Sequence, residues 1–294
     1  MHLKQFRILL LFLAVLIFDV CLLQHIEEKT RQMNCFSYET ALEHFRNHRI
    51  SEETLAKFMQ ASEGGMEHFA GLMTMYFAEE GLETDVKLLE QDMTYAMEYH
   101  GDEFRRLRGA VLAVWQDLKR FPVGRVQTKD AGKTGGAAKA GGTDFVTFAD
   151  SWMQSRTFGG ERGHEGTDIM AEINQRGIYP IYSMTDGVVE NIGWLKLGGY
   201  RIGIRSDSGA YFYYAHLAEY AREFEIGERV TAGTHLGYMG DTGYSEVPGT
   251  TGMFDLHLHL GIYLNDGSGT EYSVNSYPML RYLWKQETDG DTTG

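Results

Sequence analysis

The chain is poor in cysteine and in basic side chains. Its 294 residues include only two cysteines, Cys21 and Cys35, so no framework of paired disulfides is available. Lysine and arginine total 27 against 41 aspartates and glutamates, which gives a net charge of −14. This balance argues against nucleic acid as a partner and against electrostatic adhesion to anionic membranes or wall polymers. A hydrophobic content of 43% nevertheless indicates a globular protein with a substantial core.

An apolar segment near the N-terminus lacks a small-x-small cleavage pattern. Residues 8–23 are apolar apart from Asp19, and Lys4 and Arg7 precede them. The segment is shorter than the roughly 20 residues of a typical bilayer span but long for a signal-peptide core. We predict a cytoplasmic tail and an uncleaved signal anchor over residues 1–30, which contacts membrane lipid and places the rest of the chain outside the cytoplasm. The alternatives are a cleaved signal peptide, which makes the protein secreted, and a buried core helix.

Helical periodicity dominates residues 36–120, where apolar side chains recur three and four positions apart. Glycines interrupt the pattern and predict about four helices joined by short turns; they are Gly64–Gly65, Gly81 and Gly101. We expect a helical stalk or adapter region with a protein partner of unknown identity. In the alternative interpretation, Glu63 or Glu67 is the acid of a glycan-cleaving activity, but neither belongs to a partner motif.

The C-terminal half differs from this helical region in its composition and in its hydrophobic pattern. Residues 121–144 are mainly Gly, Ala, Lys and Thr, which predicts a flexible linker. Over residues 145–285, short β-prone runs alternate with glycine turns, and no helical pattern interrupts them before about Met279–Trp284. This pattern predicts a mainly antiparallel β domain. Residues 286–294 are expected to form a disordered tail.

Two local patterns in the β domain suggest a metal site. In "FDLHLHLGIY", His257 and His259 alternate with leucines, so both imidazoles project from one face of a strand. In "ERGHEGTDIM", His164 and Asp168 are four positions apart and share a face of an extended segment. Imidazole nitrogen and carboxylate oxygen both bind zinc. Two ligands from the second pattern and one histidine from the first make three, the number typical of a catalytic zinc site.

Two histidines remain once these three ligands are counted. One is His216 in "YFYYAHL", and the other is whichever of His257 and His259 does not bind the metal. Neutral imidazoles beside a zinc site can act as a general base or donate to a developing oxyanion. Spacing alone leaves open which histidine of the pair is the ligand.

The order of these motifs resembles the M23 family of lysostaphin-type, LytM-like zinc endopeptidases, which cut peptidoglycan peptides. The H-x-x-x-D motif is followed by "YYAHL", "GERVTAG", "GYMGDTGYS" and H-x-H, and the matching stretch runs from about Asp150 to Leu264. The resemblance implies a lysostaphin-type (duplicated hybrid motif-like) antiparallel β fold with one Zn²⁺ per catalytic domain. It assigns the metal to His164, Asp168 and His259, and the two catalytic roles to His216 and His257.

From the resemblance we expect a membrane-anchored, extracytoplasmic zinc metalloendopeptidase that hydrolyses peptide bonds in peptidoglycan stems or cross-bridges during cell-wall remodelling. A non-catalytic wall-binding or complex-scaffolding protein that retains the fold is one alternative, and a zinc D-Ala-D-Ala carboxypeptidase is another. Several residues are expected to have no part in the chemistry. His235 is predicted to be structural, Tyr211, Tyr213 and Tyr214 to pack mainly in the core, and His25, His44, His48, His68 and His100 to be solvated.

Overall fold

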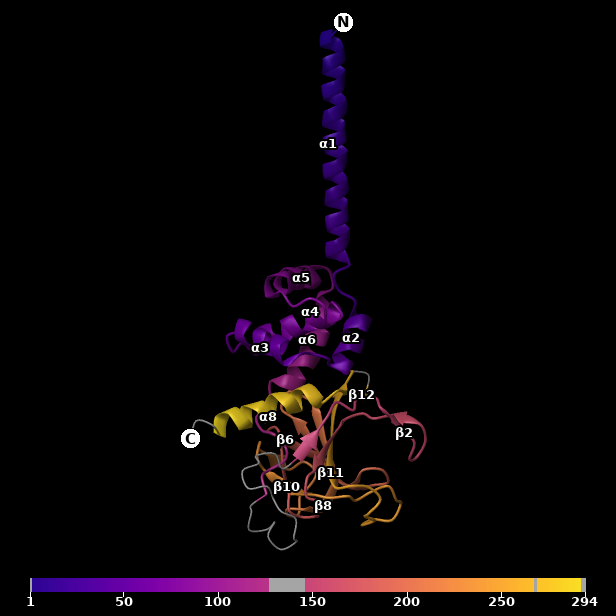
Figure 1. Ribbon diagram of the computed structural model, residues 1–294, viewed down its shortest axis with the longest axis vertical. Coiled ribbons are helices and arrows are strands. Elements are labelled where there is room, and N and C mark those ends of the chain that lie inside the picture. Colours follow the sequence, from indigo (N-terminus) through magenta and orange to yellow (C-terminus); the bar gives the residue numbers. More distant parts are fainter. Residues whose placement is uncertain (1, 127–145, 267–268, 292–294) are drawn as a thin grey trace.

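The computed structural model describes residues 2–126, 146–266 and 269–291 of the chain. A long N-terminal helix, a cluster of shorter helices and a β domain follow one another along the longest axis (Figure 1). The helices are α1 (His2–Met33), α2 (Tyr38–Asn47), α3 (Glu52–Ala61), α4 (Met66–Ala78), α5 (Val86–Tyr99), α6 (Gly101–Trp115) and α8 (Tyr277–Asp291). The strands are β1 (Val146–Phe148), β2 (Ser155–Arg156), β3 (Arg162–Gly163), β4 (Thr167–Ala171), β5 (Pro180–Tyr182), β6 (Gly187–Leu195), β7 (Gly199–Ser206), β8 (Tyr211–Tyr220), β9 (Arg229–Val230), β10 (His235–Met239), β11 (His257–Asn265) and β12 (Glu271–Val274).

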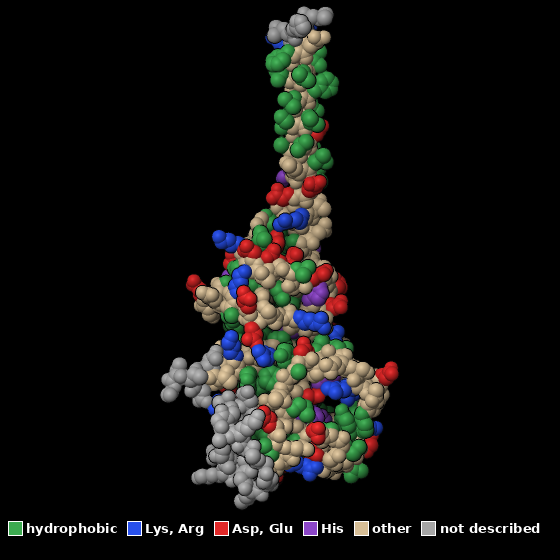
Figure 2. All heavy atoms as spheres, viewed as in Figure 1, with side chains coloured by type: hydrophobic (Ala, Val, Ile, Leu, Met, Phe, Trp, Pro, Cys, Tyr) green, Lys and Arg blue, Asp and Glu red, His purple; other side chains and the backbone are tan. Residues whose placement is uncertain are grey.

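Helix α1 continues without a break from the apolar segment into the polar residues that follow it. Its apolar side chains are exposed along the rod (Figure 2). Among the described residues it is the one helix that is long and apolar enough to cross a membrane, a property that signal sequences share. Near its C-terminal end, Arg31 lies 3.7 Å from the carboxylate of Asp92 in α5, and this ion pair joins the helix to the cluster.

Helices α2 to α6 form the helix cluster, one helix more than the glycine breaks indicated. Ser37, Ser51 and Asp85 cap the N-termini of α2, α3 and α5, because each side chain accepts a hydrogen bond from a backbone N–H in the first turn. Helix α4 contacts α2, α3, α5 and α6. All residues from Phe69 to Phe77 are buried, as expected for a central helix that is apolar on every face.

The expectation that His48 is solvated is wrong. Its side chain is fully buried among the rings of Phe45, Phe77 and Trp115. Trp115 donates its indole N–H to His48 Nε2 over 3.1 Å, so the neutral ring carries its proton on Nδ1. Burial lowers the pKa of His48 to about 3. The sequence shows no sign of this burial, because His48 follows the end of α2, where the helical periodicity stops.

We expect this histidine to make the folded chain sensitive to acid. Between a pKa of about 3 in the folded state and about 6.5 in the unfolded state, the unfolded state binds one proton more. The free energy of unfolding therefore decreases as the pH is lowered through this window, by about 1.4 kcal/mol for each pH unit. Urea unfolding in detergent at pH 7, 5.5 and 4.5 measures the loss, and His48→Gln should reduce it, because the amide accepts the Trp115 N–H without titrating. Parallel pH dependences in the two proteins would contradict the assignment.

The β domain is built around one large antiparallel sheet, which confirms the predicted fold class. Ten strands form this sheet, with the path β1-β4-β11-β8-β7-β6-β9, while β12 pairs with β11 and β10 pairs with β5 and β8. Each of these pairs is antiparallel. Strands β2 and β3 form a separate hairpin (Figure 1). Phe212 and Tyr214 of β8 and Leu258 and Leu260 of β11 are fully buried in the core.

The first residues of the predicted linker pack with the β domain. Phe121 and Val123 are buried, Val123 forms an isolated bridge with Ile181, and Tyr182 donates its backbone N–H to Pro122. The remainder of the predicted linker, residues 127–145, lies outside the described residues. The chain has therefore joined the β domain by residue 121.

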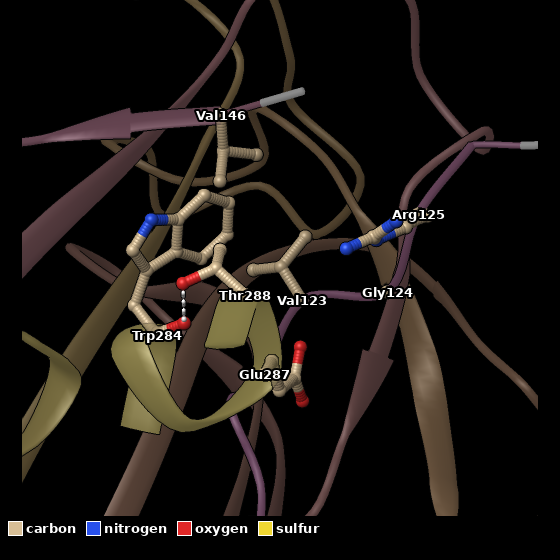
Figure 3. A pocket seen from close by; sticks show the side chains of 7 residues that line it. All are labelled: Val123, Gly124, Arg125, Val146, Trp284, Glu287 and Thr288. Carbon is tan, nitrogen blue, oxygen red and sulfur yellow. Dashed lines mark hydrogen bonds between the residues drawn. The ribbon is translucent and has the colours of Figure 1, made fainter. Parts of the chain in front are cut away.

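Helix α8 lies between the helix cluster and the sheet (Figure 1). Tyr282 packs on Trp115 of α6, with ring centroids 5.6 Å apart, and Trp284 packs on Phe121 at 4.8 Å. Figure 3 shows Trp284 close to Val123 and Val146, around a cavity of about 10 Å³. This volume is at the lower limit for one water molecule, so the cavity is a packing defect rather than a ligand site.

The helix also changes the description of the C-terminus. It extends to Asp291 and so includes residues 286–291, which were predicted to be part of a disordered tail. Thr288 donates its hydroxyl to the carbonyl of Trp284 over 3.1 Å, a backbone contact one turn earlier in the helix (Figure 3). Residues 292–294 lie outside the described residues.

Candidate metal centre

Neighbouring strands bring two of the predicted ligands together. Asp168 of β4 lies directly opposite His259 of β11, and His259 lies opposite Ala215 of β8. Side chains of directly opposed residues share one face of a sheet, so Asp168 and His259 meet although 91 residues separate them. His257 lies two residues before His259 and therefore on the same face, while Leu258 is buried on the other side.

His164 completes a compact set of three ligand atoms. Its Nε2 lies 3.0 Å from Asp168 Oδ1 and 3.0 Å from His259 Nδ1, and His259 Nδ1 lies 3.0 Å from Asp168 Oδ1. These atoms, which we call the ligand triangle, can approach a common metal ion. In tetrahedral zinc with bonds of about 2.0–2.1 Å, ligand atoms lie roughly 3.3 Å apart. Two imidazole nitrogens and one carboxylate oxygen at this separation fit one face of a zinc tetrahedron.

Hydrogen bonds to Nδ1 orient three of the histidines. His164 Nδ1 lies 2.9 Å from Ser151 Oγ and 3.2 Å from the Ser151 carbonyl oxygen. His216 Nδ1 donates to the Thr242 carbonyl, and His257 Nδ1 donates to the Asp255 carbonyl, each over 2.7 Å. A carbonyl oxygen only accepts, so Nδ1 carries the proton in each neutral ring and Nε2 keeps a lone pair. In His164 this lone pair belongs to the ligand triangle.

A β-bulge turns His216 toward the centre. The register of β7 and β8 shifts between the Tyr200–Leu217 and Ile202–Tyr214 pairs, which leaves an extra residue in β8. His216 has a φ of 63°, in the left-handed region that costs non-glycine residues conformational energy. Its ring centroid lies 4.7 Å from that of His257 and 6.1 Å from that of His259. His216 therefore lies beside the ligand triangle without being part of it.

The electrostatics favour an ionised carboxylate next to neutral imidazoles. Burial alone would raise the pKa of the Asp168 carboxyl, but its contacts with His164, His259 and His257 outweigh this effect and hold that pKa well below its usual range. Burial lowers the pKa of His216, and the neighbouring imidazoles lower it further. Burial also lowers the pKa of His259, against the opposing hydrogen bond with Asp168. These are the protonation states in which such side chains bind zinc.

The turn that contains Gly166 passes too close to β11 to leave room for a side chain at this position. A Cβ built at this position would lie 2.7 Å from Cε1 of His259 and 2.6 Å from the carbonyl oxygen of Leu260. Any side chain there would push a ligand imidazole or the strand backbone away. The glycine between His164 and Asp168 thus has a specific role in the packing of the site.

Arg156 is a partner of the centre that the sequence analysis missed. Its Nη2 lies 2.8 Å from Oδ2 of Asp168, the carboxylate oxygen outside the ligand triangle. The arginine reaches this oxygen because β2 folds back on β3 through a turn that contains Gly159 and Gly160. The glycine pair is a sequence signal for the turn, but no spacing rule links Arg156 to Asp168.

Aromatic side chains cover the two histidines outside the ligand triangle. His216 and His257 are only 5% and 9% exposed, respectively. The ring of Phe254 packs 4.6 Å from that of His216 and 5.0 Å from that of His257, and Tyr244 packs on Phe254 at 4.8 Å. Phe158, in the turn of the β2–β3 hairpin, stacks on Tyr244 with ring centroids 4.1 Å apart. A substrate must pass these aromatic rings to reach the two imidazoles. The residues that carry the rings follow no regular sequence pattern, so the sequence did not indicate this cover.

The remaining residues singled out in the sequence lie in other surroundings. Tyr214 is fully buried and accepts the Met184 backbone N–H, while the Tyr213 ring lies 6.1 Å from that of His259 and borders the site. His235 packs on Tyr182 and contacts the Gly237 carbonyl, which fits the predicted structural role. Glu63 and Glu67 are both exposed, and Glu67 lies 3.4 Å from Arg108.

Comparison with protein families places these residues in a known context. Peptidase family M23 matches residues 162–271, a range that contains the ligand triangle, His216 and His257. An L-Ala–D-Glu endopeptidase of Bacillus subtilis is 44% identical over 144 residues, which are 49% of this chain and 42% of the relative. The glycyl-glycine endopeptidase ALE-1 of Staphylococcus capitis is 32% identical over 120 residues, 40% of this chain and 29% of the relative. The chain thus matches less than half the length of these curated relatives.

A solved structure extends the similarity to most of the chain. It is a crystal structure from Ruminococcus gnavus, described as a candidate glycyl-glycine endopeptidase LytM, with 41% identity and a TM-score of 0.65. The match covers 82% of this chain and 90% of that chain. Since the β domain is about half of the sequence, a match of this extent includes residues of the helix cluster.

Proposed function

This chain belongs to peptidase family M23, and on that basis we propose that it is a zinc metalloendopeptidase that hydrolyses peptide bonds in peptidoglycan stems or cross-bridges. The observation that carries the proposal is the ligand triangle, with sides of 3.0 Å, beside two further imidazoles. We assign one zinc ion to His164, Asp168 and His259, and catalytic roles to His216 and His257. A non-catalytic scaffold would have no need of all five side chains in this arrangement.

The residues around the metal are suited to proton transfer. Bound zinc supplies a Lewis acid that polarises a peptide carbonyl. The Nε2 lone pair of His216, free because Nδ1 donates to Thr242, accepts a proton from the attacking water and returns it to the leaving amine. His257 Nδ1–H is held by the Asp255 carbonyl, so a proton taken up on its Nε2 lone pair would let Nε2–H donate to the oxyanion of the tetrahedral carbon. Arg156 holds the outer oxygen of Asp168, so that one oxygen of this carboxylate faces the metal.

We propose the L-Ala–D-Glu bond of the stem peptide as the first candidate for cleavage. The curated relative named for this bond is 44% identical to the chain, against 32% for the curated relative named for glycyl-glycine bonds and 41% for the solved structure described as a candidate glycyl-glycine endopeptidase. A glycine cross-bridge is the alternative substrate.

We also propose that α1 is a retained membrane anchor and that the β domain lies outside the cytoplasm. Basic residues precede the apolar segment, as is typical of helices whose N-terminus stays in the cytoplasm. The polar end of α1 packs on the helix cluster through Arg31 and Asp92. The β domain would then act on wall peptides close to the membrane.

Mass spectrometry of muropeptides tests the proposal. The full chain, purified in detergent from membranes washed at alkaline pH, is incubated with sacculi that have direct or glycine cross-links. We expect new fragments from an internal cut at L-Ala–D-Glu, no cleavage after zinc is removed with a chelator, and recovery when zinc is added back. Release of the chain by the alkaline wash would contradict the anchor.

Three other results would point to the alternatives. Loss of single terminal residues from the stem would indicate a carboxypeptidase. Unchanged muropeptides after incubation with the zinc-loaded chain would favour a wall-binding or scaffolding protein. Fragments from glycine bridges alone would retain the endopeptidase but change its substrate.

A further inference from the structure

Residues Asp150–Trp152 connect the helix cluster to the ligand triangle. They lie between β1 and β2 and belong to no strand. The β-sheet ladder therefore does not hold them in place, and their position depends on other contacts. Side-chain hydrogen bonds extend from this segment in two directions.

On the inner side, the segment holds a metal ligand. His164 Nδ1 lies 2.9 Å from Ser151 Oγ and 3.2 Å from the Ser151 carbonyl oxygen. The His164 backbone is bound on both sides as well, because it donates its N–H to Gln154 and accepts the N–H of Met153, each over 2.9 Å. These contacts fix both the tautomer of the imidazole and the direction of its Nε2.

On the outer side, the segment is held by α2. The indole N–H of Trp152 donates to Oδ1 of Asn47, the last residue of α2, over 3.0 Å. Asn275 donates one amide group both to the Asn47 carbonyl at 3.0 Å and to the Asp150 carboxylate at 3.2 Å. The same carboxylate accepts the backbone N–H of Trp152 at 3.1 Å. One end of the helix cluster therefore holds the flanks of Ser151.

Asn275 makes this connection rigid. It is 1% exposed, its amide oxygen accepts the Tyr277 backbone N–H over 3.0 Å, and its backbone N–H donates to Arg46 over 2.8 Å. Its side-chain and backbone donors are thus used at a buried junction of α2, the β domain and α8. A displacement of α2 would break several of these bonds together.

We propose that Asn47 and Trp152 are positioning residues for the metal centre, so that the helix cluster sets the affinity of the β domain for zinc. The proposal rests on the zinc site proposed above. Groups that hydrogen-bond the outer nitrogen of a metal-ligating histidine fix its orientation, and removing them typically weakens metal binding 10–100-fold. Ser151 makes that contact here, and Asn47 holds the neighbour of Ser151. The helix cluster thereby acquires a role in the chemistry beyond connecting the β domain to α1.

Zinc titration of full-length variants tests the proposal. Competition with a chromophoric chelator gives the zinc Kd of the wild type and of Ser151→Ala, Trp152→Phe and Asn47→Leu. We expect each variant to bind zinc about tenfold more weakly. Asn47→Asp keeps an oxygen that accepts the Trp152 N–H, so it should stay within about twofold of the wild type. Cobalt(II) bound in place of zinc should show altered d–d absorption in the three weakened variants and unaltered absorption in Asn47→Asp.

A matched variant separates positioning from general loss of stability. Gln116→Ala removes a different hydrogen bond between the helix cluster and the β domain, to Ser208, and should leave the zinc Kd unchanged. The proposal is overturned by unchanged zinc binding in Trp152→Phe and Asn47→Leu, or by equal weakening in Asn47→Leu, Asn47→Asp and Gln116→Ala. Failure of the wild type to bind zinc would instead refute the proposed function. Since the readout is metal affinity, an unidentified peptide substrate does not affect the result.

Discussion

Replacing His259 with alanine is expected to remove bound zinc and to slow peptidoglycan cleavage about a thousandfold or more, the effect of losing several kcal/mol of Lewis-acid stabilisation. His259 Nδ1 is one corner of the ligand triangle, 3.0 Å from each of the other two ligand atoms. With His164 and Asp168 alone, the site has fewer protein ligands than the three that catalytic zinc sites use. Metal analysis after dialysis gives the zinc content, and release of muropeptides gives the rate.

His68→Ala is a matched control for this variant. His68 lies in α4, where it pairs with Glu90 at 3.2 Å, so its removal should change neither zinc content nor rate. Far-UV circular dichroism shows whether His259→Ala retains its fold. A folded His259→Ala protein that still binds one zinc per chain would exclude His259 as a ligand.

Replacing His216 with alanine is expected to leave zinc binding intact and to slow cleavage by about 10²–10⁴-fold, the usual contribution of a general base. The ring lies beside the ligand triangle, and its Nδ1–H is fixed by Thr242, so Nε2 is the nitrogen available for proton transfer. Burial lowers the pKa of this imidazole, which keeps it neutral and able to accept a proton near pH 7. Zinc content and the rate of muropeptide release, measured on the same preparation, separate the two roles.

His235→Ala provides the comparison within the β domain. His235 contacts the carbonyl of Gly237 and packs on Tyr182, away from the ligand triangle in the sheet order. Its loss should leave the rate within about twofold, as is usual for a substitution outside the chemistry. If His216→Ala loses zinc together with activity, His216 is a ligand; if it keeps full activity, it has no catalytic role.

Local patterns were sufficient to predict the β domain and a cluster of histidine and aspartate side chains, whereas the roles of the five site residues stay predictions from the family resemblance. Alternation of His257 and His259 with leucines predicted one polar and one buried face, and Leu258 and Leu260 are fully buried. The even spacing of His164 and Asp168 predicted a shared face, and their ligand atoms lie 3.0 Å apart. The first prediction succeeded because side-chain direction in a strand depends on residue parity. His164 lies between β3 and β4, so its approach to Asp168 also depends on the bend at Gly166.

Patterns failed where a residue's surroundings come from distant parts of the chain. His48 follows a helix in a polar stretch, yet α4 and α6 bury it between Phe77 and Trp115. Phe121 and Val123, at the start of the predicted linker, find partners in α8 and β5. Neither residue has neighbours in sequence that indicate these contacts.

The sequence by itself determined the kinds of donor atom, their order along the chain and the strand that carries His257 and His259, but it left open which of these two histidines is the ligand. Only the tertiary structure decided how that site is completed. The register of β4 against β11 sets Asp168 opposite His259, the bulge in β8 turns His216 inward, and the contact of Trp152 with Asn47 ties Ser151 to the helix cluster. The physical reason is that chemical identity and face are local properties, whereas register, bulges and contacts across 105 residues depend on how whole elements pack.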